Sequence, residues 1–145
     1  SAVRLIRAAV PSMKKQKWGR IINLASISAK QPVERLLLSN VLRPGIIGLT
    51  KTLSRELAPH NVLVNAVCPG YFSTDRVKDL MEKKAAAQKR QASELLTEKE
   101  AEIPLQRLGN PAELGDLVAF LASEESSYIT GTTLTIDGGF HKGLM

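Results

Sequence analysis

The chain has 145 residues, 43% of them hydrophobic and 23% charged, which suits one globular domain with a core of its own. Its net charge is +6 at pH 7, but the basic residues are dispersed and aromatic residues make up only 4%, which argues against a nucleic-acid surface. No run approaches the ~18 apolar residues that would cross a membrane, and the first residues are typical of an amphipathic helix rather than a signal peptide.

The first elements in chain order are a helix and a strand. Residues 2–13 place apolar side chains at helical spacing, and Pro11 is expected to end or kink that helix. Residues 20–26 predict a short buried strand, and residues 27–38 predict a loop.

A second helix is expected from about Ser39 to Leu57. Ser39 or Asn40 would cap it, and Pro44 would fall within its first turn. Residues 59–61 would end it, because asparagine accepts the left-handed backbone angles of a helix terminus.

Residues 62–68 are an apolar, β-branched run that predicts a strand buried on both faces. The run contains the only cysteine, Cys68, interpreted as a small core residue; this cysteine usage excludes an intrachain disulfide and favours a cytoplasmic protein. Pro69 and Gly70 end the strand. Thr74 follows where open α/β sheets bind ligands, just outside the carboxyl ends of the strands.

Residues 75–105 form a polar, largely helical insertion, which is either a lid over a substrate pocket or a solvated excursion. Residues 107–111 predict a turn, and Pro111 opens a helix that runs to about residue 123. A last strand is expected at residues 133–136.

Strands that alternate with helices predict a parallel sheet with right-handed crossovers, so the fold class is α/β with about three strands. We expect one domain over residues 1–145. Neither His60 nor His141 has metal-ligand spacing, so no metal site is predicted.

Four segments, in this order and spacing, resemble the carboxyl-terminal half of the short-chain dehydrogenase/reductase family. They are residues 23–26, 48–51, 65–74 and 131–139. The resemblance implies a Rossmann-type three-layer sandwich, present here only as its carboxyl-terminal portion. It also implies hydride transfer between NAD or NADP and an alcohol/ketone pair, with the phosphate-binding loop lying outside this chain.

In that family a serine, a tyrosine and a lysine act together, and by resemblance Ser26 is the serine that steadies the substrate carbonyl. The tyrosine and the lysine should fall nine and five residues before Gly48, where this chain has Ser39 and Arg43. A serine hydroxyl is far less acidic than a tyrosine hydroxyl, and arginine stays protonated, so it cannot act as a base. Arg43 can still bind ribose hydroxyls or a phosphate.

Three interpretations of Ser39 and Arg43 stay open. The pair supports an altered reductase, leaves a catalytically impaired cofactor-binding or oligomerisation module, or is merely a helix cap and a surface residue. By composition, a nucleic-acid or membrane partner is not expected.

The resemblance also implies a cofactor site and an assembly. Pro69, Gly70 and Thr74 would border the nicotinamide, and residues 2–13 and 39–57 would form the interface of a homo-oligomer, a dimer or a tetramer. We expect the site residues of the two halves of the chain to surround one cleft at the carboxyl ends of the strands.

Overall fold

The computed structural model describes residues 2–144 and contains a sheet of three parallel strands. The strands are β1 (Gly19–Leu24), β2 (Val62–Pro69) and β3 (Thr133–Ile136), in the order β1-β2-β3. The predicted α/β fold with a parallel sheet is therefore confirmed, and β2 is its central strand.

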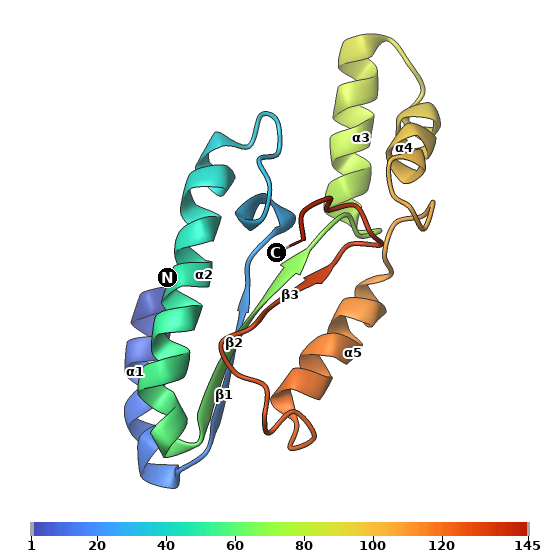
Figure 1. Cartoon of the computed structure of the whole chain (residues 1–145). Helices are drawn as coiled ribbons and strands as arrows, with labels where there is room; N and C mark the ends of the chain where they lie inside the picture. Colours follow the sequence, from blue (N-terminus) through green and yellow to red (C-terminus); the bar gives the residue numbers. More distant parts are fainter. Residues whose placement is uncertain (1, 145) are drawn as a thin grey trace.

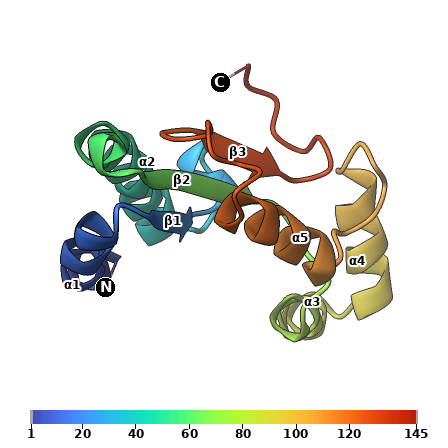
Figure 2. The same ribbon diagram turned by 90° about the horizontal axis from the view of Figure 1, so that it is seen from below.

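Helices cover the two faces of this sheet unequally. The described residues form the α-helices α1 (Ala2–Gln16), α2 (Leu37–Leu57), α3 (Asp75–Gln88), α4 (Ala92–Ala101) and α5 (Pro111–Ala122), and the 3₁₀ turns η1 (Ile27–Ala29) and η2 (Ala58–His60). Helices α1 and α2 lie on one side and α5 on the other (Figures 1 and 2). The α3–α4 pair projects past the carboxyl end of β2 (Figure 1). No helix in residues 2–144 is long and apolar enough to cross a membrane.

The core is built on β2, of which every residue but the last is buried. Val62 and Val64 pack with Leu57 of α2, and half-buried side chains of α1 and β1 close the cluster. A strand that is apolar at almost every position needs cover on both faces. Helix α2 packs against β2 on one face, and α5 lies on the opposite side of the sheet, where it contacts β1.

The start of α2 differs from the prediction. The helix begins at Leu37, its cap position makes no side-chain bond, and the predicted cap by Ser39 or Asn40 is wrong. Asn40 instead exchanges two bonds with the backbone of Val33, at 3.0 and 2.9 Å, because the preceding loop folds back onto it. The earlier start also places Pro44 inside the helix rather than in its first turn.

The first helix and strand also differ in extent from the prediction. Pro11 does not end α1, which continues to Gln16. Pro11 and Arg7 are both exposed, so water can bond the Arg7 carbonyl that a proline leaves without its helical donor. The first strand ends at Leu24, and part of the predicted loop forms η1.

The local signals at Asn61, Pro111 and Gly131 agree with the structure. Asn61 ends η2 with φ +55°, and Asn110 and Glu113 form a capping box around Pro111. Gly131 has φ +70° and lies so close to the Ser54 hydroxyl that a Cβ would collide with it. That approach lets the chain pass beneath α2 into β3.

Candidate active site

The site lies where β1 and β2 end side by side. Leu24 is paired with Val67, and the N–H of Ala25 donates to the Val67 carbonyl at 2.8 Å. The chain then turns into η1 on one side, while β2 runs on through Cys68 and Pro69. The residues that follow β1 therefore lie beside the end of the central strand.

Two of the predicted site residues, Ser26 and Ser39, are joined through a third serine. The Ser26 hydroxyl oxygen caps η1 by accepting the N–H of Ser28 at 3.2 Å. The hydroxyl oxygens of Ser28 and Ser39 are 2.7 Å apart. Ser39 is therefore not a helix cap but a member of a serine cluster made of Ser26, Ser28 and Ser39.

Ser28 was missed by the sequence reasoning. Its only local signal was a position two residues after Ser26 at a strand end, where serine often bonds the neighbouring backbone. Its contact with Ser39 joins residues of different elements, which no local pattern predicts.

Arg43 reaches from α2 to the end of β1. Its Nη1 donates to the carbonyl oxygen of Leu24 at 2.9 Å. Arginine has five N–H donors, so this bond holds the guanidinium at the sheet edge and leaves most of its donors for a ligand. Within residues 2–144 no carboxylate forms an ion pair with Arg43, which leaves its charge available to an anionic or polyhydroxyl group.

Cys68 lies beside the same cluster and is fully buried. Burial raises the pKa of its thiol above 9.0, against the smaller opposing effects of the Ser26 backbone and the charges of Lys30 and Arg43. The thiol is therefore protonated at neutral pH, and its interpretation as a small core residue is retained.

The backbone at Gly70 lies close to another segment of this chain, at Asp137. A Cβ at this position would lie 2.6 Å from the Cβ of Asp137, and the Gly70 N–H donates to the Ile136 carbonyl at 2.9 Å. The glycine that follows Pro69 is thus explained by the turn after β3. Its N–H is already bonded within the sheet.

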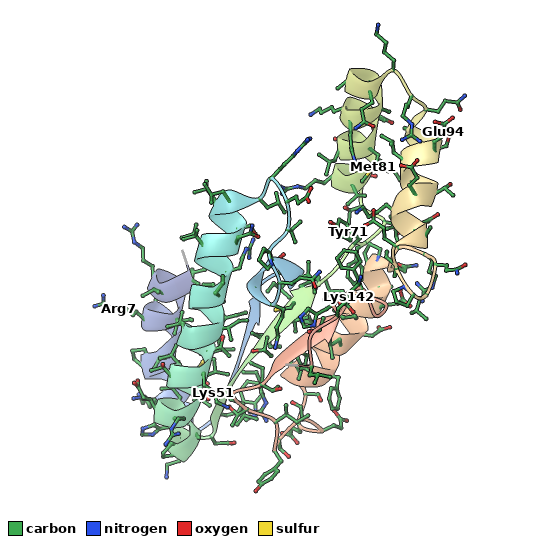
Figure 3. The ribbon with its side chains drawn as sticks, turned by 45° about the horizontal axis from the view of Figure 1, so that its top comes forward. Arg7, Lys51, Tyr71, Met81, Glu94 and Lys142 are labelled. Atoms are coloured by element: carbon green, nitrogen blue, oxygen red, sulfur yellow. The ribbon has the colours of Figure 1, made fainter. Side chains whose placement is uncertain are left out.

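Thr74 lies apart from the serine cluster. It is exposed, it occupies the cap position of α3, and its hydroxyl makes no cap bond. It lines a cavity of about 290 Å³ together with Val77, Met81 and Leu96, and neither Ser26 nor Arg43 lines this cavity. Figure 3 shows Met81 between α3 and α4 and Tyr71 near the base of that pair.

The structure therefore brings Ser26, Ser39 and Arg43 together and leaves Thr74 at the entrance of the α3–α4 pair. Hydroxyl donors next to an unpaired cation can polarise a carbonyl oxygen and bind sugar hydroxyls. The carboxyl edge of the sheet therefore provides groups that can bind a carbonyl oxygen and sugar hydroxyls.

Comparison with known proteins assigns the fold to a family. A family profile described as enoyl-(acyl carrier protein) reductase matches residues 1–141. The NADPH-dependent reductase BacG of Bacillus subtilis is 38% identical over 142 residues, which are 96% of this chain and 54% of that protein. The 3-oxoacyl-[acyl-carrier-protein] reductase FabG of Aquifex aeolicus is 41% identical over 127 residues, which are 88% of this chain and 47% of that protein.

Solved structures give the same result. The NADPH-dependent reductase YwfH superposes with a TM-score of 0.92 at 35% identity, over 99% of this chain and 55% of that one. L-sorbose reductase from Gluconobacter frateurii, solved with NADPH and L-sorbose, also superposes with a TM-score of 0.92, at 32% identity over 99% of this chain and 55% of that one. The chain spans about half the length of the curated relatives it matches and belongs to the short-chain dehydrogenase/reductase family.

Proposed function

We propose that the protein containing this chain is an NAD(P)-dependent oxidoreductase that acts on an alcohol/ketone pair. The observation that carries the proposal is the convergence of the Ser26 and Ser39 hydroxyls with Arg43 at the carboxyl edge of the sheet. Its relatives include reductases whose names or titles specify NADPH, which makes NADPH the first cofactor to test.

Each residue has a distinct role in this proposal. Ser26 accepts the Ser28 N–H and keeps its own hydrogen for the substrate carbonyl oxygen. Ser39 supplies a second hydroxyl, and Arg43 binds ribose hydroxyls with the N–H groups that Leu24 does not use. A nicotinamide cofactor supplies the hydride when it is bound, and Pro69, Gly70 and Thr74 would border its ring.

The donors of Arg43 and Thr74 fit such a cofactor. Arg43 has no carboxylate partner among the described residues, and the Thr74 hydroxyl is exposed and makes no cap bond. Hydroxyl and guanidinium donors suit ribose oxygens and a carboxamide. The N–H of Gly70 is already bonded to Ile136, so the ring's carboxamide would be met by other groups near the strand end.

A second candidate is a cofactor-binding or oligomerisation module with impaired catalysis. One expectation and one observation favour it: the family resemblance implies that Ser39 and Arg43 stand where the family has tyrosine and lysine, and α1 and α2 expose large apolar side chains. These are Val3, Leu5, Leu37, Leu38, Val41 and Leu42. We propose that this face joins copies of the chain into a dimer or tetramer, and that the protein is cytoplasmic.

The test uses the protein at the full length its gene encodes. Reduced cofactor is mixed with a panel of ketones and aldehydes, and its oxidation is followed by absorbance. Turnover of at least one substrate is expected. Cofactor binding without any turnover across the panel would favour the module instead, and neither binding nor turnover would reject both the enzyme and the cofactor-binding form of the module.

Two variants assign the roles. Arg43→Ala should weaken cofactor binding about tenfold, because a charged hydrogen bond is lost. Arg55→Ala is the matched control, since Arg55 is an exposed arginine near the far end of α2. If Ser39→Tyr with Arg43→Lys creates turnover in a protein that only binds cofactor, the module interpretation is supported.

A further inference from the structure

Ser28 lies at the centre of the serine cluster and has no role in the reaction as proposed so far. It is in η1 and is 3% exposed. Its N–H holds the Ser26 oxygen at 3.2 Å, and its hydroxyl lies 2.7 Å from that of Ser39, its only partner in the described part of the chain. One buried residue therefore contacts both hydroxyls that would face the substrate.

The direction of the Ser28–Ser39 bond follows from burial. Either oxygen can be the donor by geometry alone. Ser28 is enclosed and its hydrogen can reach only Ser39, whereas Ser39 is half-buried and can also reach a ligand. When a carbonyl group is present, the arrangement with most bonds has Ser28 donating to Ser39 and Ser39 donating to the ligand.

This direction strengthens Ser39 as a donor. A hydroxyl that accepts a hydrogen bond is polarised and gives a stronger bond of its own. A donor that is already aimed at developing negative charge also avoids the cost of reorientation during the reaction. Both effects matter more for serine than for tyrosine, because a serine hydroxyl is the weaker acid.

We propose that Ser28 is a positioning residue that aims the Ser39 hydroxyl at the substrate carbonyl oxygen and holds Ser26 beside it. The proposal rests on the proposed function, because Ser28 touches neither substrate nor cofactor and acts only through Ser39 and Ser26. The side-chain part of this role, toward Ser39, is removed by substitution to alanine, while the N–H bond to Ser26 remains.

The experiment is a double-mutant cycle on the full-length enzyme with Ser28→Ala and Ser39→Ala. Ser28→Ala should lower kcat about tenfold, the effect of one lost hydrogen bond to a donor at the reacting group, and change KM less than twofold. In the Ser39→Ala background it should lower kcat no further, because its target is gone. Ser54→Ala is the matched control, since Ser54 is also a serine 3% exposed and its hydroxyl, within residues 2–144, bonds only the α2 backbone.

Three results would overturn the proposal. The first is a kcat of Ser28→Ala equal to that of the wild type. The second is that Ser28→Ala lowers kcat by the same factor in the Ser39→Ala background as in the wild type. The third is that Ser54→Ala lowers kcat as much as Ser28→Ala does. A crystal structure of the Ser28→Ala variant tests the positioning role independently of turnover. The Ser39 side chain should then occupy more than one rotamer, and an unchanged Ser39 side chain rejects the role. If the wild type turns over no substrate, the proposed function fails, whereas the rotamer still decides whether Ser28 positions Ser39.

Discussion

The β1–β2 edge and the α3–α4 pair are built in opposite ways. At the edge, Ser28, Cys68 and the body of β2 are buried, and side chains from α2 bond directly to the end of β1. In the α3–α4 pair, a small cluster of Met81, Ala85 and Leu95 is the apolar core that joins the helices.

The difference shows which part of the site is fixed and which part can move. Few buried apolar contacts mean a low free energy of local opening, and the α3–α4 pair has few. Ser26, Ser39 and Arg43 are on the fixed side, and Thr74 is at the junction between the two. Positions that orient a reacting group belong on rigid elements, whereas the entrance to a pocket needs a movable one.

The largest effect is expected on the fixed side. Leu57→Ala should lower the free energy of unfolding by about 3 kcal/mol, because Leu57 is 2% exposed and packs against Val62 and Val64. Chemical denaturation measures this loss. Leu80→Ala is the control, since Leu80 is 55% exposed and lies on α3, outside the face proposed to join copies of the chain. Equal effects of the two variants would contradict the placement of the core.

A smaller and local effect is expected in the α3–α4 pair. Leu95→Ala should remove about 2 kcal/mol of protection from the amides of α3 and α4 while the amides of β2 keep theirs, because Leu95 belongs to the small cluster that joins these two helices. Hydrogen exchange resolved by segment measures both regions. Leu80→Ala, on an exposed face of α3, serves as control. Loss of protection throughout β2 would show that the two regions unfold together.

The sequence predicted the parts whose cause is local. The apolar run of residues 62–68 predicted β2, Pro111 predicted the start of α5, and Asn61 ends η2 in a left-handed conformation as expected. Each depends on backbone preferences or burial within a few residues of chain.

The predictions that were wrong or missing concern contacts that no short stretch of sequence specifies. Asn40 was expected to cap a helix, but the loop before it offers the backbone of Val33, so α2 starts earlier. In the site, the family resemblance identified Ser26, Ser39 and Arg43 as candidates, whereas Ser28 needed the structure because its contact crosses two elements.

Lys99 should make a moderate contribution to the position of α4. Its ammonium nitrogen lies 4.7 Å from the ring centre of Tyr71 and 5.8 Å from that of Phe140, and the two rings meet edge to face. Lys99→Met should therefore weaken protection of the α4 amides by about 1 kcal/mol, the size of a cation–π contact. Hydrogen exchange measures it.

Glu102→Gln separates the two interactions of Lys99. It removes the 2.6 Å ion pair between Lys99 and Glu102 but keeps the ammonium over the rings. An exposed ion pair contributes little, so this variant should behave almost as the wild type. If it matches Lys99→Met, the aromatic contact does not hold α4.

The smallest effect is a pH dependence of stability at the start of α5. The Arg107 guanidinium, and then the N–H of Asn110, lower the pKa of Glu113 from 4.5 to about 2. A lowered carboxyl pKa stabilises the fold at pH values above 4.5, and this contribution is lost as the pH falls toward 2. Glu113→Gln should flatten the fall of the thermal midpoint across that window, whereas Glu124→Gln, an exposed carboxylate without an ion pair in residues 2–144, should not. If both variants keep the wild-type slope, the charge of Glu113 and its bonds to Arg107 and Asn110 contribute nothing measurable to the pH dependence of stability.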